Sequence, residues 1–377
     1  MHFKIIKSNI INIGPQHPAA HGVLRLLIDL KGEIVNKIQV EIGYLHRGTE
    51  KLIEYKRYTQ NIPYFDRLDY VSTINCEFLF YQFQLGINKN IKKNSNDILI
   101  LVELMRISNH LLAITTHVMD IGAISPFLWA FEIREIIFEI LEEISGGRMH
   151  SNIINFYKKL YIKNIIKIKI LNLIEGSLIK NIYNIIYILN NRIWYKRTKN
   201  VGLISYKQCL AFSLTGIIAR SAGISIDLRK YYSFNNLYSK IFFNIPFTNS
   251  SDIFNRFILK LEEMLESIII IKQLLNFNNI KLNNVIYKNT METVINKFKF
   301  EYTHKNFNYP YYTSIEAPKG EMACIGRVKD DVFLRLKIRS PGFFNLQSYS
   351  NIAKNTLLTD ALTILGSYDI VLGEIDR

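Results

Sequence analysis

The apolar residues of this chain change their spacing twice, and these changes limit the folds available to it. Over residues 23–42 apolar and polar residues alternate, with Lys31 and Gly32 between the two halves, which predicts a β-hairpin with one apolar face. From residue 47 the apolar residues recur at helical spacing over most of the chain up to residue 290. Alternation returns after Tyr312, notably over residues 332–338. The predicted fold class is α+β, with an N-terminal β-hairpin, a large central helical bundle and a mixed α/β C-terminal part.

Several predicted helices are bounded by residues typical of helix ends. One helix is predicted over residues 97–119. Another has Ser125 as its N-cap and Pro126 as its first helical residue, and it ends before Gly146 and Gly147. Further helices are predicted at residues 178–194, at 251–275 behind a Ser-Ser-Asp cap, and at 359–365 as the last helix.

The chain has no internal repeat and no linker rich in proline or serine. We divide it into residues 1–46 (loop and hairpin), 47–290 (helical bundle) and 291–377 (mixed part). Because nothing in the sequence separates these parts, we expect them to share one core.

The net charge of +15 would suit a nucleic acid or an anionic membrane surface as a partner. The basic residues are, however, interspersed with isoleucine and asparagine, as in residues 152–169 and 181–200, and AT-rich codons favour lysine, isoleucine and asparagine. We therefore predict no nucleic-acid partner; RNA binding with a steep salt dependence would indicate the alternative. We expect no membrane-spanning helix, since a span needs roughly 20 consecutive apolar residues, and no N-terminal targeting segment.

The cysteines indicate which redox groups this chain can hold by itself. Cys76, Cys209 and Cys324 are scattered singly, without a C-x-x-C pair or a fourth sulfur. We expect no iron–sulfur cluster, structural zinc or other metal site within this chain, and a reducing compartment around it. No G-x-G-x-x-G or Walker-type loop is present, so a nucleotide site lacks support.

A few polar residues stand in unusual surroundings. His17 and His21 lie in a loop at residues 14–22 that proline and glycine constrain, which suits either a binding loop or a loop that only orders the hairpin. Asp120 ends an apolar helical segment, where it is either a buried acid with a specific partner or a helix-end residue. Tyr70 could donate a hydrogen bond to a carbonyl oxygen, although it is one of 22 tyrosines.

Several sequence blocks together resemble one known family, and they span nearly the whole chain. These blocks are residues 14–26, 46–51, 65–72, 109–110, 115–123, 147–150, 220–230, 316–321 and 366–377. They are similar to the 49-kDa-type quinone-site subunits of respiratory complex I, a family related to the large subunit of nickel-iron hydrogenases. The resemblance implies a hydrogenase-like fold. The family usually follows residues 148–150 with a basic Pro-Gly-Gly turn, whereas residues 151–159 here contain neither proline nor glycine.

The two Cys-x-x-Cys pairs that hold the hydrogenase metal centre are missing. Asp69 and Ser72 stand where the first pair would be, and Val371 and Glu374 where the second would be. A nickel-iron centre needs soft thiolate ligands, so it cannot form here. The resemblance implies that quinone uses the vacated pocket.

The same resemblance assigns roles to individual residues. His21 and Tyr70 would each donate a hydrogen bond to one quinone carbonyl, and Asp120 would pair with His21. The residues implied to line the quinone pocket are His17, Arg67, Asp369 and Val371, and those implied to lie beside the partner's cluster are Arg47 and His150.

The implied function is reduction of ubiquinone with electrons from a [4Fe-4S] cluster that a partner subunit holds, coupled to proton translocation. The expected partners are that cluster-bearing subunit, which is homologous to the hydrogenase small subunit, and membrane-arm subunits of complex I. The expected location is peripheral, on the matrix side of the mitochondrial inner membrane, with mitochondrial encoding suggested by the AT bias and a bacterial origin as the alternative. A catalytically silent scaffold subunit is the alternative function, and the presence of His21, Tyr70 and Asp120 together argues against it.

Overall fold

The computed structural model describes residues 9–16, 22–87, 96–154, 160–189, 192–231, 238–276, 309–329 and 332–377, with 291–292 and 295. His17 and His21 therefore lie outside the described residues. Residues 151–159 depart from the family pattern, and residues 155–159 of that segment also lie outside the described residues.

The N-terminal part forms a three-stranded antiparallel sheet of β1 (Asn9–Ile13), β2 (Arg25–Lys31) and β3 (Ile34–Glu41). Strands β2 and β3 are the predicted hairpin, with Leu26 opposite Val40. Leu26, Ile28 and Leu30 are buried while the residues between them are partly exposed, because successive side chains of a strand point to opposite faces. Strand β1 is an addition to the predicted hairpin.

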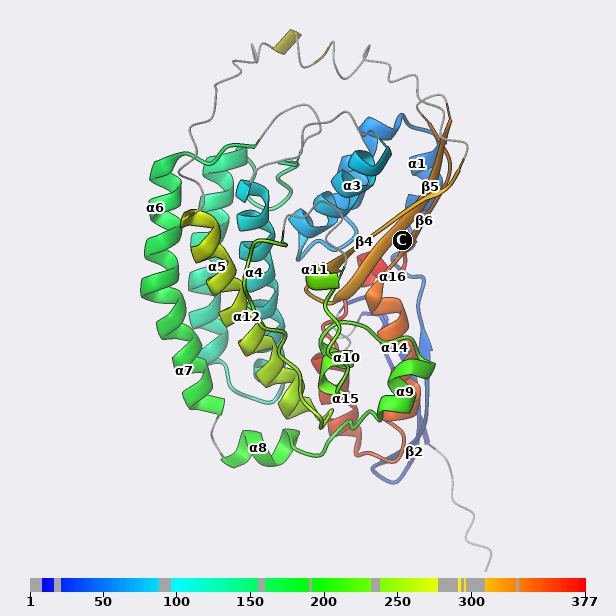
Figure 1. The fold of residues 1–377 in the computed structure, drawn as a ribbon. Coiled ribbons are helices and arrows are strands. Elements are labelled where there is room, and N and C mark those ends of the chain that lie inside the picture. Colours follow the sequence, from blue (N-terminus) through cyan, green and yellow to red (C-terminus); the bar gives the residue numbers. More distant parts are fainter. Residues whose placement is uncertain are drawn as a thin grey trace, which may run out of the picture.

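The central part is a bundle of long helices, as predicted. Helix α4 (Asn96–Asp120) packs against α5 (Ser125–Ser145) and α12 (Ile253–Asn276), and α6 (Asn164–Asn172), η3 (Leu173–Leu178) and α7 (Ile179–Leu189) run along the outer side of α5 (Figure 1). By length and composition α4 could cross a membrane, but 94% of its apolar window is buried inside the protein. Helix α4 thus lies in the core of the bundle.

The ends of these helices test the predicted caps. The Asp252 carboxylate accepts a hydrogen bond from the N–H of Asn255 at 2.8 Å, which confirms the cap before α12. Gly146, with a φ of +83°, ends α5 as predicted. The N-cap assigned to Ser125 is wrong, because α5 already includes Ser125, and Ile124 precedes it without a side-chain cap. The helix predicted at 178–194 corresponds to α7 and α8 (Arg192–Thr198).

Shorter elements connect the hairpin and the bundle to the C-terminal part. They are α1 (Thr49–Glu54), η2 (Tyr58–Asn61), α2 (Ile62–Asp66), α3 (Thr73–Ile87), α9 (Tyr206–Ala211), α10 (Ile217–Ser221) and α11 (Leu228–Tyr231). The six residues between α2 and α3 carry much of the site described below.

The C-terminal part is mixed, as predicted. A second antiparallel sheet consists of β4 (Tyr311–Ala317), β5 (Gly320–Lys329) and β6 (Val332–Arg339), and α3 packs against it. Helices α14 (Pro341–Ile352), α15 (Leu358–Ser367) and α16 (Leu372–Ile375) follow. Helix α15 matches the helix predicted at 359–365, but α16 comes after it, so the predicted helix is not the last.

The apolar interior of the described residues falls into two clusters. The larger lies among α3, α4, α5, α12 and the second sheet. The smaller lies between the first sheet and α14 and α15. The smaller cluster joins the N-terminal part of the chain to the C-terminal part. The part boundaries at residues 46 and 290 stay predictions.

The beginning and the end of the chain are also joined by hydrogen bonds. The N–H of Val35 in β3 donates to the carbonyl of Thr356 at 2.9 Å. The Asp376 carboxylate accepts from the N–H groups of Gly43 and Leu45 at 2.9 and 2.7 Å. Residues more than 300 positions apart are therefore held together at this edge of the molecule.

Candidate functional site

Two segments that are far apart in the sequence meet at one place, and the resemblance had aligned both with metal-binding cysteine pairs. They are residues 67–72, between α2 and α3, and residues 369–374, which lead into α16. At Gly373 an added Cβ would lie 2.6 Å from the carbonyl oxygen of Leu68 and 3.3 Å from the ring of Tyr70. Only a glycine lets the two segments approach so closely.

A buried lysine ties the two segments together. Lys319, in the turn between β4 and β5, donates to both carboxylate oxygens of Asp69 at 2.8 and 3.0 Å and to the side-chain carbonyl of Asn109 at 2.5 Å. The amide of Asn109 donates in turn to Asp369 at 2.8 Å, and the ammonium of Lys319 lies 3.9 Å from Asp369. We call Asp69, Asn109, Lys319 and Asp369 the lysine cluster.

Lys319 and Asp369 keep each other charged. Burial by itself would lower the pKa of Lys319, but Asp369 and Asp69 raise it well above its usual value. Burial would raise the pKa of Asp369, but Lys319 and Lys260 hold it below its usual value. Asp369 also has a φ of +54°, a left-handed conformation that is uncommon for a residue with a side chain. Such strain is typically found at functional sites.

Tyr70 directly follows Asp69 of the lysine cluster and lies at the surface. Asp69 is buried, while Tyr70 is 41% exposed and its ring lies near Gly373, where an added Cβ would be 3.3 Å from it. Removal of water around the phenol raises the pKa of Tyr70, and the negative charge of Asp69 raises it further. The phenol is therefore a protonated hydrogen-bond donor at neutral pH, and part of it is open to a ligand or a partner.

Arg47, Arg67 and His150 lie on segments fastened around residues 67–72. The Arg47 guanidinium donates to the carbonyl of Arg67 at 2.6 Å, and Arg67 donates to the carbonyl of Pro63 at 2.9 Å. The hydroxyl of Thr73 donates to the carbonyl of Met149, next to His150, at 3.1 Å. All three of these basic residues are exposed. The structure thus brings Arg47, Arg67, Tyr70, His150 and Asp369 to one region, and Val371 is buried within it.

The loop that carries His17 and His21 ends close to the same region. An added Cβ at Gly22 would lie 3.1 Å from Leu372 at the start of α16. The exit of the loop is therefore next to residues 369–374, although the two histidines themselves lie outside the described residues.

Asp120 differs from the buried acid that its apolar neighbours suggested. It is exposed at the end of α4, where the helix leaves the core. His117, one turn earlier, is buried and its Nε2 lies 3.0 Å from the carbonyl oxygen of Thr363. His117 and Asp120 therefore have different surroundings, and the interpretation of Asp120 as a buried acid is wrong.

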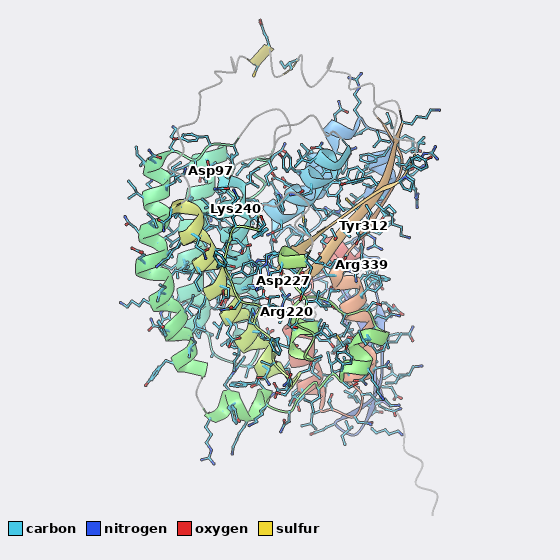
Figure 2. The ribbon with its side chains drawn as sticks, in the orientation of Figure 1. Asp97, Arg220, Asp227, Lys240, Tyr312 and Arg339 are labelled. Carbon is cyan, nitrogen blue, oxygen red and sulfur yellow. The ribbon has the colours of Figure 1, made fainter. Side chains whose placement is uncertain are left out.

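A second group of buried charges had no role assigned from the sequence. We call it the core charge cluster, and it consists of Glu103, Arg106, His110, Arg220, Asp227, Arg229, Glu263 and Glu316. Arg220 pairs with Glu263 and donates to Glu316 at 2.7 Å; Figure 2 places Arg220 and Asp227 at the centre of the molecule. The spacing of Glu103, Arg106 and His110 on one face of α4 was the signal that could have revealed it.

Comparisons with known proteins agree on one family. The family model of the respiratory-chain NADH dehydrogenase 49 kDa subunit matches residues 120–377. The chain is 41% identical to the NADH-ubiquinone oxidoreductase 49 kDa subunit of Acanthamoeba castellanii, over 99% of this chain and 96% of the relative. It is also 41% identical to the protein of that name in Dictyostelium discoideum, over 99% and 97%. The NADH dehydrogenase [ubiquinone] iron-sulfur protein 2 of Nephroselmis olivacea is 40% identical, over 99% and 98%.

Proposed function

This chain belongs to the 49 kDa subunit family of the respiratory-chain NADH dehydrogenase, and from that premise we propose that it forms the quinone-reducing site of the complex. As a complex I subunit it is part of an oxidoreductase and has other complex I subunits as partners. The observation that carries the proposal is the position of Tyr70. Tyr70 is partly exposed and follows Asp69 of the buried lysine cluster, where residues 67–72 meet residues 369–374.

The chemistry of quinone reduction suits this arrangement. Two electrons added to a quinone place negative charge on both carbonyl oxygens, and donors fixed in advance stabilise that charge as it develops. Tyr70 would donate to one carbonyl and His21 to the other. A phenol and an imidazole can also deliver the two protons that the quinol needs. Arg67, Asp369, Val371 and His17 would surround the headgroup, which is the use we propose for the vacated pocket of a hydrogenase-like fold.

The electrons would come from a [4Fe-4S] cluster held by the partner subunit that is homologous to the hydrogenase small subunit. Positive charge near a cluster favours its reduced state, and Arg47 and His150 would supply it at the interface. The chain's own cysteines, Cys76, Cys209 and Cys324, stand singly in the sequence without a C-x-x-C pair, which is why we assign the cluster to a partner.

The proposal extends to coupling and location. Transfer of a proton from His21 would leave Asp120 without its partner's charge, and that imbalance would start proton translocation in the membrane arm. The subunit would then lie in the peripheral arm, on the matrix side of the mitochondrial inner membrane, and be mitochondrially encoded.

Tyr70→Phe in the intact complex tests the proposed site. The variant removes one hydroxyl and should lower NADH:ubiquinone reductase activity by about 10²-fold, the usual effect of losing one donor to a developing oxyanion. Electron transfer from NADH to an artificial acceptor upstream of quinone should stay normal. Tyr206→Phe, at another exposed tyrosine, is the matched control. Unchanged quinone reduction by Tyr70→Phe would favour the silent scaffold instead.

A further inference from the structure

Glu374, at one of the positions where a thiolate would stand in a hydrogenase, is a buried acid that the proposed function does not use. Its side chain lies on α16 and is 1% exposed. One carboxyl oxygen accepts a hydrogen bond from the N–H of Gly342 at 3.1 Å. The other has no hydrogen-bond partner among the described residues. A buried oxygen without a partner is costly for a carboxylate and much less so for a neutral carboxyl group.

On balance, the charges that face Glu374 also favour its neutral form. They are Asp69 from the segment before α3, Lys319 from the turn between β4 and β5, and Asp369 from the segment before α16. Lys319 is already shared by Asp69 and Asp369. A third carboxylate would leave three negative charges around one ammonium. Burial, and then the charge of Asp69, raise the pKa of Glu374 to about 8.

The charged form is still accessible, because two features stabilise it in part. Lys319 faces it, and the N–H of Gly342 belongs to the first turn of α14, whose N-terminal end carries a partial positive charge. Glu374 can therefore give up a proton and take one up again without leaving its place.

We infer that Glu374 is a positioning residue that holds a proton close to the segment of Tyr70 and returns it to the phenol after each reduction of quinone. The inference rests on the proposed function. Glu374 adjoins Gly373, where an added Cβ would lie 2.6 Å from the carbonyl oxygen of Leu68 and 3.3 Å from the ring of Tyr70, so the two groups lie on segments that touch. Glu374 itself does not contact the quinone; it acts through Tyr70.

The protons and electrons balance. The quinone would gain two electrons from the partner's cluster and two protons, one from the imidazole of protonated His21 and one from the O–H of Tyr70, which becomes a phenolate. The O–H bond of the Glu374 carboxyl group then breaks, the phenol O–H forms again, and Glu374 is left as a carboxylate near Lys319. A proton from the solvent side restores the carboxyl group before the next turnover.

Glu374→Gln in the intact complex tests the inference, because glutamine has the same shape but no proton to give. Wild-type quinone reduction should fall as the pH rises through about 8, where the acid is ionised beforehand. The variant should be slower by about 10²-fold at neutral pH and should lose this pH dependence. Glu374→Asp, which keeps an acid, should recover part of the rate. Glu175→Gln, at an exposed glutamate, is the control.

Infrared difference spectra between the oxidised and the reduced complex give a second measurement. These spectra would not change at Glu374 if its role were only structural. Turnover should change the C=O band of a protonated carboxyl group, and Glu374→Gln should remove that band. An unchanged rate profile and band in Glu374→Gln, alongside a slow Tyr70→Phe enzyme, would overturn this inference alone. Normal activity in both variants would overturn the proposed function as well. If Glu374→Gln does not assemble, an unshifted pH profile in Glu374→Asp would refute the inference.

Discussion

Replacing Lys319 by methionine should destabilise this subunit much more than the loss of an ordinary ion pair. The ammonium of Lys319 is the cation bound directly by Asp69, at 2.8 Å, and both side chains are no more than 2% exposed. Methionine fills a similar volume but leaves the Asp69 carboxylate buried without that charge. Breaking a buried pair in this way costs about 3–5 kcal/mol. At about 2 °C per kcal/mol for a large domain, the unfolding temperature should fall by about 6–10 °C.

The assay is the temperature at which this subunit becomes sensitive to protease within the intact complex. Lys51→Met is the matched control, because Lys51 pairs with Glu54 at the same distance of 2.8 Å but is 63% exposed. An exposed pair contributes about 0.2–1 kcal/mol, so the control should shift the unfolding temperature by about 2 °C or less.

A double variant separates the unpaired charge from the loss of packing. Adding Asp69→Asn to Lys319→Met removes the buried charge, and it should restore at least half of the lost stability, since removing both partners of a buried pair is often nearly neutral. Equal shifts for Lys319→Met and Lys51→Met would refute the reasoning. So would a double variant that is less stable than Lys319→Met.

Two further predictions concern the segment around His150. If His150 lies beside the partner's cluster, His150→Met should abolish the pH dependence of that cluster's midpoint potential while leaving the cluster assembled. Redox titration measures this potential, and a potential that still follows pH would contradict the assignment. Glu77 is buried and accepts a hydrogen bond from the N–H of Ile154 at 2.8 Å, and burial followed by the nearby Asp66 raises its pKa well above the usual range. The folded state holds this proton more tightly than the unfolded chain, whose glutamates titrate at about 4.3. The protonated Glu77 therefore stabilises the fold fully below about pH 4.3, and this stability is lost as the pH rises through the folded-state pKa. Glu77→Gln should make protease cleavage at residues 148–154 less dependent on pH, and an unchanged dependence would count against a protonated Glu77.

The sequence predicted the elements whose signals are local. Apolar spacing placed α4 within one residue of its observed ends, because a long helix with a buried stripe leaves a strong periodic pattern. Asp252 was predicted as part of a cap because capping depends on neighbouring residues only. Strand β1 was missed because it is five residues long and mostly exposed, so its sequence has no clear alternation.

The lysine cluster shows why much of the site could not be predicted by spacing. Asp69, Asn109, Lys319 and Asp369 come from four separate places in the chain, and only the fold brings them together. The resemblance to a family pointed to Asp369 as a pocket residue, but nothing in the sequence paired Lys319 with Asp69. For Asp120 the sequence left two interpretations open, a buried acid and a helix-end residue. Its neighbours in sequence are apolar, yet α4 ends at that residue and its side chain is exposed, so the second interpretation is confirmed.

The hydrogen bonds between β3 and the end of the chain have a consequence for synthesis. The N-terminal hairpin leaves the ribosome first, but α14, α15 and the Asp376 carboxylate, which cover and fasten it, are translated last. Until then the apolar side of the hairpin lacks the cover of α14 and α15, and exposed strands of this kind are prone to aggregate. A nascent chain of this protein therefore depends on a chaperone or on its growing helical bundle to shield those strands until translation is nearly complete.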